Sequence, residues 1–599
     1  MADFHGPARV LAAMPPEIIS SILECLIPQP PEIGETKPVS YNQMIADEPW
    51  FNFTRCHRGL RSLCLVSRRL SQTAFPLLYR TVAVWDEKSM LLFFRTLCNN
   101  PSYGTWTRYF SCHLTLTSNT VIREFRDLIP RYLTTFSAAE GVEPMVMATG
   151  RLLVLLHGSV RDLVAGRGGE RLPQIFLTFI LAYLSKVETV LIQVPVSDDQ
   201  EEYQVLCEQI AGISHYDAMA PESASSPRPF HSIRTLAIQG DPELLAEFEK
   251  EDCECEHDHS DVWGAQPRKY ASLFASLPNL TTLEVSSDDG VWSMMPDDET
   301  WPLMPDGTNP DPFNFDKPFL PNLRHVFLHD SIAYPGDLHY LLLQAPKLET
   351  LYMAPRGDYA LKASVDDNGL AEHPDSLNNG LINHGKNLRT LDVSWEDISG
   401  FVSLVGPDGR LNALPQLPSL RSLCIQLAML YGTPQAVLET PLVDLLPPNL
   451  TELTLIDWWW HHVELIDTIP DWKVEDKVRY YQSQHHYRVQ ALRTLTEFAR
   501  EVVARLPQLK KVVFLVQIPW TWILEGAVPL EFHFEVLKGV FQEEGIAFFV
   551  ESDEQCAFSS ASQDHQSTQS DQPNTYFTRF LSRFPCRNDP PRADPAKLA

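Results

Sequence analysis

LAAMPPEIISSILECLIP, residues 11–28, is the first stretch of the chain with a clear structural pattern. Pro15 and Pro16 stand where a helix can begin, because the first turn has no use for their missing amide protons. Glu17 follows in that turn, where a negative charge suits the positive end of the helix dipole. Apolar residues then recur on one helical face: Ile18, Ile19, Ile22, Leu23 and Leu26.

A second amphipathic stretch, LRSLCLVSRRLSQTAFPLLYR, occupies residues 60–80. Its apolar positions repeat at helical spacing, with Pro76 interrupting them. Two short helices bury too little surface to be stable alone. We therefore expect the two stretches to pack on each other and on another part of the chain.

The order of residues in these stretches resembles the F-box, in the form found in fungal proteins. Its opening matches Met14-Pro15-Pro16-Glu17, and its second half matches residues 63–69 (LCLVSRR) and 78–80 (LYR). Residues 29–58 form an insertion that the family usually lacks. The resemblance implies docking to a Skp-family adaptor, and through it to a cullin, by Met14, Pro15, Ile18, Ile22, Leu23 and Leu26. A plain N-terminal helical hairpin is the alternative.

Composition limits the classes of partner. The chain has 599 residues and a formal charge of −29, which argues against nucleic acid or an anionic membrane as the main partner. Its 11 cysteines have no framework spacing, and no signal-peptide pattern precedes them. The longest apolar run, residues 175–184, is too short to span a bilayer. We expect a cytoplasmic or nuclear protein.

An internal repeat begins near residue 186. Blocks of the form L-x-x-L-x-L, with substitutions, recur nine times, and their last two apolar positions have the two-residue period of a strand. The blocks are Val187/Val190/Ile192, Ile233/Leu236/Ile238, Leu280/Leu283/Val285, Leu323/Val326/Leu328, Leu348/Leu351/Met353, Leu388/Leu391/Val393, Leu420/Leu423/Ile425, Leu450/Leu453/Leu455 and Leu509/Val512/Phe514.

These blocks resemble an irregular leucine-rich repeat, whose units bury their apolar faces only by stacking. Their spacing runs from 25 residues (Leu323 to Leu348) to 59 (Leu450 to Leu509), against roughly 20–29 in regular repeats. The usual asparagine after the strand is also absent. The predicted fold class is α/β, with an N-terminal F-box-like helical module followed by an irregular leucine-rich-repeat-like solenoid. An ordinary α/β domain with parallel strands is the alternative.

The predicted boundaries are an N-terminal tail at 1–10, the F-box-like module at 11–85 with an inserted loop at 29–58, the repeat domain at 86–550 and a disordered tail at 551–599. Loops after the repeat strands carry tryptophans, which suit a protein-binding surface but are often simply buried. The candidates for substrate binding are Trp395, Trp458, Trp459, Trp460, Trp520 and Trp522.

One short segment contains residues of the zinc-ligand type, Cys253, Cys255, His257 and His259. Their alternate spacing suits a tetrahedral site poorly, so an exposed acidic loop is favoured over a metal site. Known catalytic motifs are missing, and we expect neither enzymatic activity nor a cofactor.

The resemblances together predict a substrate-recognition subunit of an SCF-type (Skp–cullin–F-box) ubiquitin ligase that binds an unknown protein substrate. A protein-binding repeat scaffold without a ligase role, and a hydrolase with an unrecognised site, are the alternatives.

Overall fold

The computed structural model describes residues 14–24, 27, 48–84, 86–113, 172–194, 230–240, 273–274, 276–286, 318, 320–331, 335–355, 377–393, 410–431, 440–457, 492–516 and 530–552.

Twelve strands form one sheet. They are β1 (Thr81–Val84), β2 (Tyr109–His113), β3 (Thr189–Val194), β4 (Thr235–Gly240), β5 (Thr282–Ser286), β6 (His325–Ser331), β7 (Thr350–Pro355), β8 (Thr390–Val393), β9 (Ser422–Gln426), β10 (Glu452–Asp457), β11 (Lys511–Val516) and β12 (Ala547–Ser552). Every neighbouring pair is parallel, and the order in the sheet is the order in the chain.

The helices that the structure describes are mostly short. The α-helices are α2 (Pro16–Glu24), α4 (Glu48–Val66), α5 (Arg68–Leu78), α6 (Glu87–Asn99), α10 (Leu172–Tyr183), α14 (Pro335–Gln344), α16 (Leu377–His384), α18 (Leu427–Tyr431) and α22 (Leu530–Glu543). Residues 492–505 are also helical. The 3₁₀ turns are η1 (Pro101–Thr105), η6 (Gly385–Asn387), η7 (Leu414–Gln416) and η8 (Leu442–Leu445). Within the described ranges, no helix has the length and apolar character needed to cross a bilayer.

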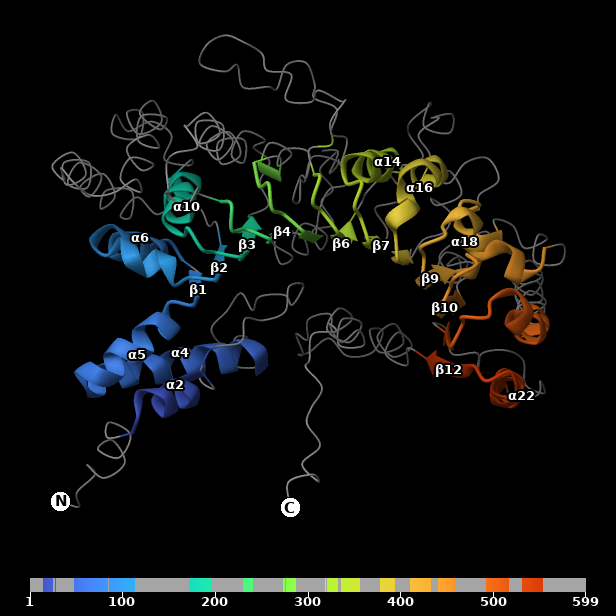
Figure 1. Ribbon diagram of the computed structural model, residues 1–599, viewed down its shortest axis with the longest axis horizontal. Coiled ribbons are helices and arrows are strands. Elements are labelled where there is room, and N and C mark those ends of the chain that lie inside the picture. The colour runs from blue at the N-terminus through green and yellow to red at the C-terminus, as the bar shows by residue number, and fades with distance from the viewer. Residues whose placement is uncertain are drawn as a thin grey trace, which may run out of the picture.

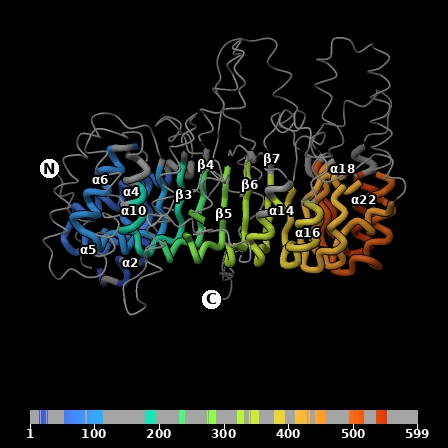
Figure 2. The backbone as a smooth tube through the Cα atoms, turned by 90° about the horizontal axis from the view of Figure 1, so that it is seen from above, coloured from blue at the N-terminus to red at the C-terminus, as the bar shows by residue number. Residues whose placement is uncertain are grey.

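The sheet curves into an arc with its strands on the inner side and α6, α10, α14, α16 and α18 on the outer side (Figure 1). Seen from above, the strands follow one another in a single row (Figure 2). Alternate residues of a strand point to opposite faces. In β5, for example, Leu283 and Val285 enter the core beneath the helices, whereas Glu284 lies on the inner face between them. One large core therefore runs the length of the arc.

The N-terminal helices have a small core of their own. Its fully buried side chains come from α2, α4 and α5: Ile19, Leu23, Leu60, Leu70 and Ala74. Helix α5 then leads directly into β1. At this junction the Tyr79 ring lies 4.9 Å from that of Tyr103 and 6.4 Å from that of Phe93, centroid to centroid. An aromatic cluster thus joins the small helical core to the first strands of the sheet.

The predicted fold class, an F-box-like module followed by an irregular leucine-rich-repeat-like solenoid, is wrong as a description of this structure. The chain has an α/β fold built on one all-parallel sheet of twelve strands that begins at Thr81. The helices before it give little support for a separate F-box-like module. They share five buried side chains, and residues 48–58, expected in a surface loop, are the first part of α4. Residue order alone did not specify this packing.

Candidate binding surfaces

Helix α2 has two apolar faces. Ile19 and Leu23 are fully buried in the small core, but Ile18 and Ile22 are 49% and 39% exposed. The helix begins at the two prolines, and the amide of Ile19 donates to the carbonyl of Pro15 at 3.1 Å. Ile18 and Ile22 stand four residues apart and so share one face. This outward face is apolar where a polar face is usual for a surface helix.

The junction of α4 and α5 adds a second exposed apolar pair. Leu65 is 84% exposed and Val66 49% exposed. Ser67 ends α4 and caps α5, because its hydroxyl accepts a hydrogen bond from the amide of Leu70 at 3.1 Å. The guanidinium of Arg69 donates to the carbonyl of Met14 at 2.9 Å. That bond holds the start of α2 beside the α4–α5 junction.

The structure places the predicted adaptor-binding residues in different environments. Pro15, Ile18 and Ile22 are exposed, Met14 is half-buried, and Leu23 is enclosed by the helices' own core. Leu26 lies outside the described residues. The surface available to a partner therefore narrows to Pro15, Ile18 and Ile22, and Leu23 holds α2 in place beneath them.

The starts of the strands form a regular hydrogen-bonded edge. At each step from β1 to β11, the backbone carbonyl just before one strand accepts hydrogen bonds from backbone amides at the start of the next strand. The carbonyl of Arg324, for example, accepts from the amides of Glu349 and Thr350 at 2.7 and 2.9 Å. Asparagine side chains reinforce this pattern by donating to a carbonyl of the preceding unit at 2.7–2.9 Å. They are Asn279, Asn322, Asn387 and Asn449.

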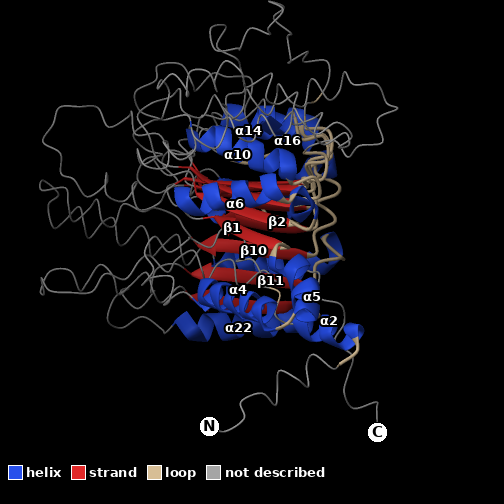
Figure 3. Ribbon diagram, turned by 90° about the vertical axis from the view of Figure 1, so that its left-hand side faces the viewer, coloured by secondary structure: helices blue, strands red, loops and turns tan. Residues whose placement is uncertain are grey.

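This asparagine ladder precedes the strands, whereas in a regular leucine-rich repeat the asparagine ordinarily follows the strand. Each of these asparagine hydrogen bonds contributes about 0.5–1.5 kcal/mol net to the free energy of folding. Because every bond joins one unit to its neighbour, the ladder fixes the spacing of successive strands. Figure 3 shows the turns before the strands as tan loops stacked along one edge of the sheet.

We call this edge the strand-start rim: the four residues before each strand from β1 to β11, with the first residue of that strand. It carries eleven cations: Arg80, Arg108, Lys186, Arg234, Arg324, Lys347, Lys386, Arg389, Arg421, Lys510 and Lys511. Its acids are Glu188, Glu349 and Glu452, so its formal charge is +8. The turn before β12 carries Glu544 instead, and the basic rim ends at β11.

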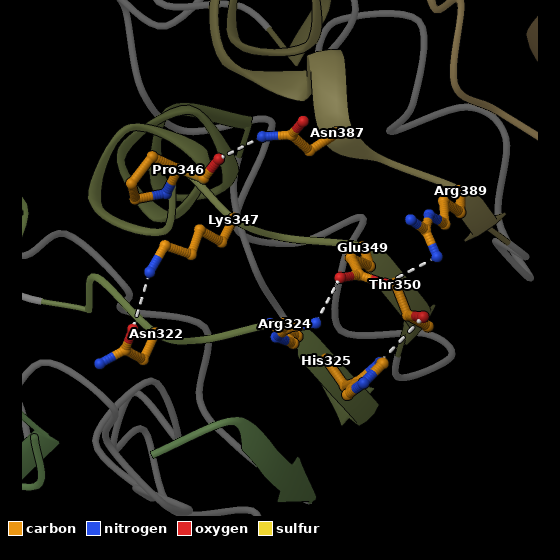
Figure 4. Close-up of polar contacts among 9 residues, drawn as sticks. All are labelled: Asn322, Arg324, His325, Pro346, Lys347, Glu349, Thr350, Asn387 and Arg389. Atoms are coloured by element: carbon orange, nitrogen blue, oxygen red, sulfur yellow. Dashed lines mark hydrogen bonds and ion pairs between the residues drawn. The ribbon is translucent and has the colours of Figure 1, made fainter. Parts of the chain in front are cut away.

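Glu349 is shared between two arginines at the middle of the rim. Its carboxylate lies 2.9 Å from Arg324 and 3.3 Å from Arg389 (Figure 4). In the same view, Lys347 donates to Asn322 at 2.8 Å, and the ring of His325 lies 3.1 Å from the hydroxyl of Thr350. Arg108 forms a looser pair with Glu188 at 3.6 Å. The other eight rim cations have no ion pair with any described residue.

A buried polar cluster lies at the centre of the inner face. Glu284, Phe327, Tyr352, Asp392 and Cys424 stand in register on β5 to β9. The imidazole of His329, two residues along β6 from Phe327, lies 3.2 Å from the Glu284 carboxylate and 4.9 Å from the Tyr352 ring. These side chains bring carboxylate, imidazole, phenol and thiol groups together on five neighbouring strands.

Burial controls the charge states in this cluster. It raises the pKa of Asp392 to about 7, although a hydrogen bond from the Cys424 thiol partly opposes this effect. Burial, with Asp392 nearby, raises the pKa of Cys424 well above its ordinary value. The pKa of Tyr352 is raised by burial and by neighbouring acidic groups. Cys424 is thus a neutral thiol that donates to Asp392, not an activated nucleophile.

The candidate substrate-binding tryptophans and the Cys253–His259 segment lie outside the described residues. Among the residues that are described, no cluster of His, Cys, Asp and Glu could hold a metal ion. The inner-face cluster and the basic rim were both missed from the sequence, because their members lie one per strand and tens of residues apart in the chain.

No known protein-family model matches the sequence, and a search of curated proteins finds no significant match.

Proposed function

We propose that this chain is the substrate-binding subunit of an SCF-type ubiquitin ligase. In this proposal, α2 and the α4–α5 junction bind a Skp-family adaptor, and through it a cullin, while the sheet domain binds a protein substrate. The protein works by holding its target near the conjugating enzyme and performs no chemistry itself. It acts in the cytoplasm or nucleus, where thiols stay reduced. The described cysteines, Cys56, Cys64, Cys98, Cys112 and Cys424, are free thiols, which suits such a compartment.

The observation that carries the proposal is the exposed pair Ile18 and Ile22. They lie in the stretch that resembles the F-box, and the neighbouring Ile19 and Leu23 anchor the other side of the helix. Full burial of such a side chain is worth about 1.5–3 kcal/mol. Covering the exposed half of each isoleucine therefore contributes about 1 kcal/mol apiece, and Leu65 adds about 2 kcal/mol more.

A binding assay with purified Skp-family adaptor tests the proposal. The full chain is expected to bind, and Ile18→Asp/Ile22→Asp to bind at least 100-fold more weakly. Both new charges would lie within the apolar contact, and burying a charge there without a partner is unfavourable. The contributions of Ile18, Ile22 and Leu65 given above make this contact worth about 4 kcal/mol of binding free energy. Leu92→Asp/Val503→Asp is the matched control, since these two apolar side chains are 41% and 43% exposed and lie on other helices.

Equal binding by the two double variants would show that α2 is not the contact. Failure of the wild-type chain to bind any adaptor would refute the ligase role and leave a protein-binding scaffold as the function.

A further inference from the structure

The formal charge of the strand-start rim has the opposite sign to the net charge of the chain. The whole protein carries −29, yet this one edge carries +8, with eleven cations from β1 to β11. All of these cations are exposed except Arg108, which is half-buried. An edge of this kind attracts anions that the rest of the surface repels. We propose that the strand-start rim binds an extended acidic segment of a partner protein, with carboxylates as the recognised groups.

The geometry of the rim suits an extended chain. Neighbouring strands lie about 4.8 Å apart, so the ten steps from β1 to β11 span about 48 Å along the sheet. An extended peptide advances about 3.4 Å per residue, and about 14 residues cover that length. The amide and asparagine ladders hold the turns in fixed register. The cations are therefore presented in a row by rigid turns.

The rim has unused capacity for acids. Glu349 already shows how a carboxylate fits here, since it joins Arg324 and Arg389, which lie just before the neighbouring strands β6 and β8. Arg234, Lys386 and Lys510 stand exposed, and their side chains make no hydrogen bond or ion pair with another described residue. Acidic side chains of a bound segment would repeat the contact that Glu349 makes at one position.

A protein segment fits this edge better than a nucleic acid does. Single-stranded nucleic acids need aromatic platforms on which their bases stack. From β3 to β11 the rim contains no Phe, Tyr or Trp, and its rings are those of His231 and His325. Over β3 to β11 the rim therefore offers charge and hydrogen bonds without stacking. At β1 and β2 its aromatic residues are half-buried (Tyr79, Trp106) or buried (Tyr109).

This inference names the class of protein held by the sheet domain, and in that respect it rests on the proposed function. The test measures fluorescence polarisation of a labelled Asp-Ser repeat peptide of about 14 residues with the full chain, at about 50 mM and about 300 mM NaCl. An Asn-Ser peptide of equal length is the neutral probe, and an oligothymidylate of similar length is the nucleic-acid probe. Wild type should bind the acidic peptide alone, and more weakly in high salt.

Charge reversal on the rim should remove the binding. Arg234→Glu/Lys386→Glu/Lys510→Glu is expected to weaken it at least tenfold. The control Lys88→Glu/Arg95→Glu/Arg500→Glu makes the same change in net charge on exposed helical positions and should stay within twofold of wild type. The neutral variant Arg234→Gln/Lys386→Gln/Lys510→Gln should weaken binding to an intermediate degree, and it gives the answer should the reversed variant fail to fold.

Three results would overturn the inference: no binding of the acidic peptide by wild type, equal losses in the rim and helix variants, or preferential binding of the oligothymidylate. The adaptor assay separates this question from the proposed function. The rim variant should still bind the Skp-family adaptor, and Ile18→Asp/Ile22→Asp should still bind the acidic peptide.

Discussion

Asp392→Asn is expected to stabilise the protein above neutral pH and to have much less effect in acid. Asp392 is a buried carboxyl in the middle of the sheet, 5% exposed, with Cys424 as its hydrogen-bond donor. No described cation pairs with it. Burial disfavours the ionised form and raises the pKa from 3.8 to about 7. An amide in its place has nothing to ionise and can still accept from the thiol.

The size of the effect follows from proton linkage. Between pH 3.8 and pH 7 the folded state binds up to one proton more than the unfolded state, so stability falls as pH rises through this window and levels off above it. Each pH unit within the window costs about 1.4 kcal/mol. From pH 5 to pH 8 the wild type should therefore lose about 2–3 kcal/mol relative to Asp392→Asn.

Urea denaturation of both proteins at pH 5 and pH 8 measures this difference directly. Glu452→Gln removes an exposed carboxylate on β10 and should change the free energy of unfolding by less than about 0.5 kcal/mol at either pH. The argument would be refuted if the difference in free energy of unfolding between wild type and Asp392→Asn were the same at pH 5 and pH 8. That result would mean that Asp392 ionises in the folded sheet without cost.

Two further changes test the packing. Gly104→Ala should destabilise the protein by about 1–3 kcal/mol in urea, because a Cβ atom there would clash with the carbonyl oxygen of Tyr183. Gly539→Ala in α22 has no described atom near its Cβ and should stabilise the protein by about 0.5–1 kcal/mol, and the reverse ranking of the two variants would contradict the placement of η1. Tyr79→Ala should cost about 2–4 kcal/mol and speed hydrogen exchange in α5 more than in β6, since Tyr79 joins the helical core to the ring of Tyr103; uniform acceleration would argue against a distinct junction.

The positions of most strands were readable from the sequence. The last two apolar positions of all nine blocks lie in β3 to β11, because a strand covered by helices must place apolar residues at alternate positions. The same rule explains the omissions. β2 (YFSCH) and β12 (AFFVES) use aromatic residues and cysteine where the blocks have leucine, and β12 extends to Ser552, into the tail predicted to be disordered. The spacing of strands in the chain says nothing of whether they form one sheet, so the topology had to come from the structure.

The candidate sites were less predictable for a different reason. Glu284 and Asp392 each lie between two core residues, a pattern that normally marks a solvent-facing position. Their burial arises from neighbours on other strands, which local periodicity does not report. The rim cations are likewise scattered: the turns before β5 and β10 have none and the others have one or two, so no window of sequence contains a basic run. Only the parallel register turns such isolated residues into a row.

The two proposed surfaces differ in the physics of their contacts, and salt should separate them in one and the same protein. The α2 face is apolar, and raising the salt concentration leaves apolar burial unchanged or strengthens it. The rim acts through exposed charges, whose attraction is screened over about 10 Å at 0.1 M salt. Adaptor binding should therefore persist at about 300 mM NaCl while acidic-peptide binding falls several-fold. Parallel losses of both activities would mean that α2 also binds through charge, and that its exposed isoleucines are not the contact.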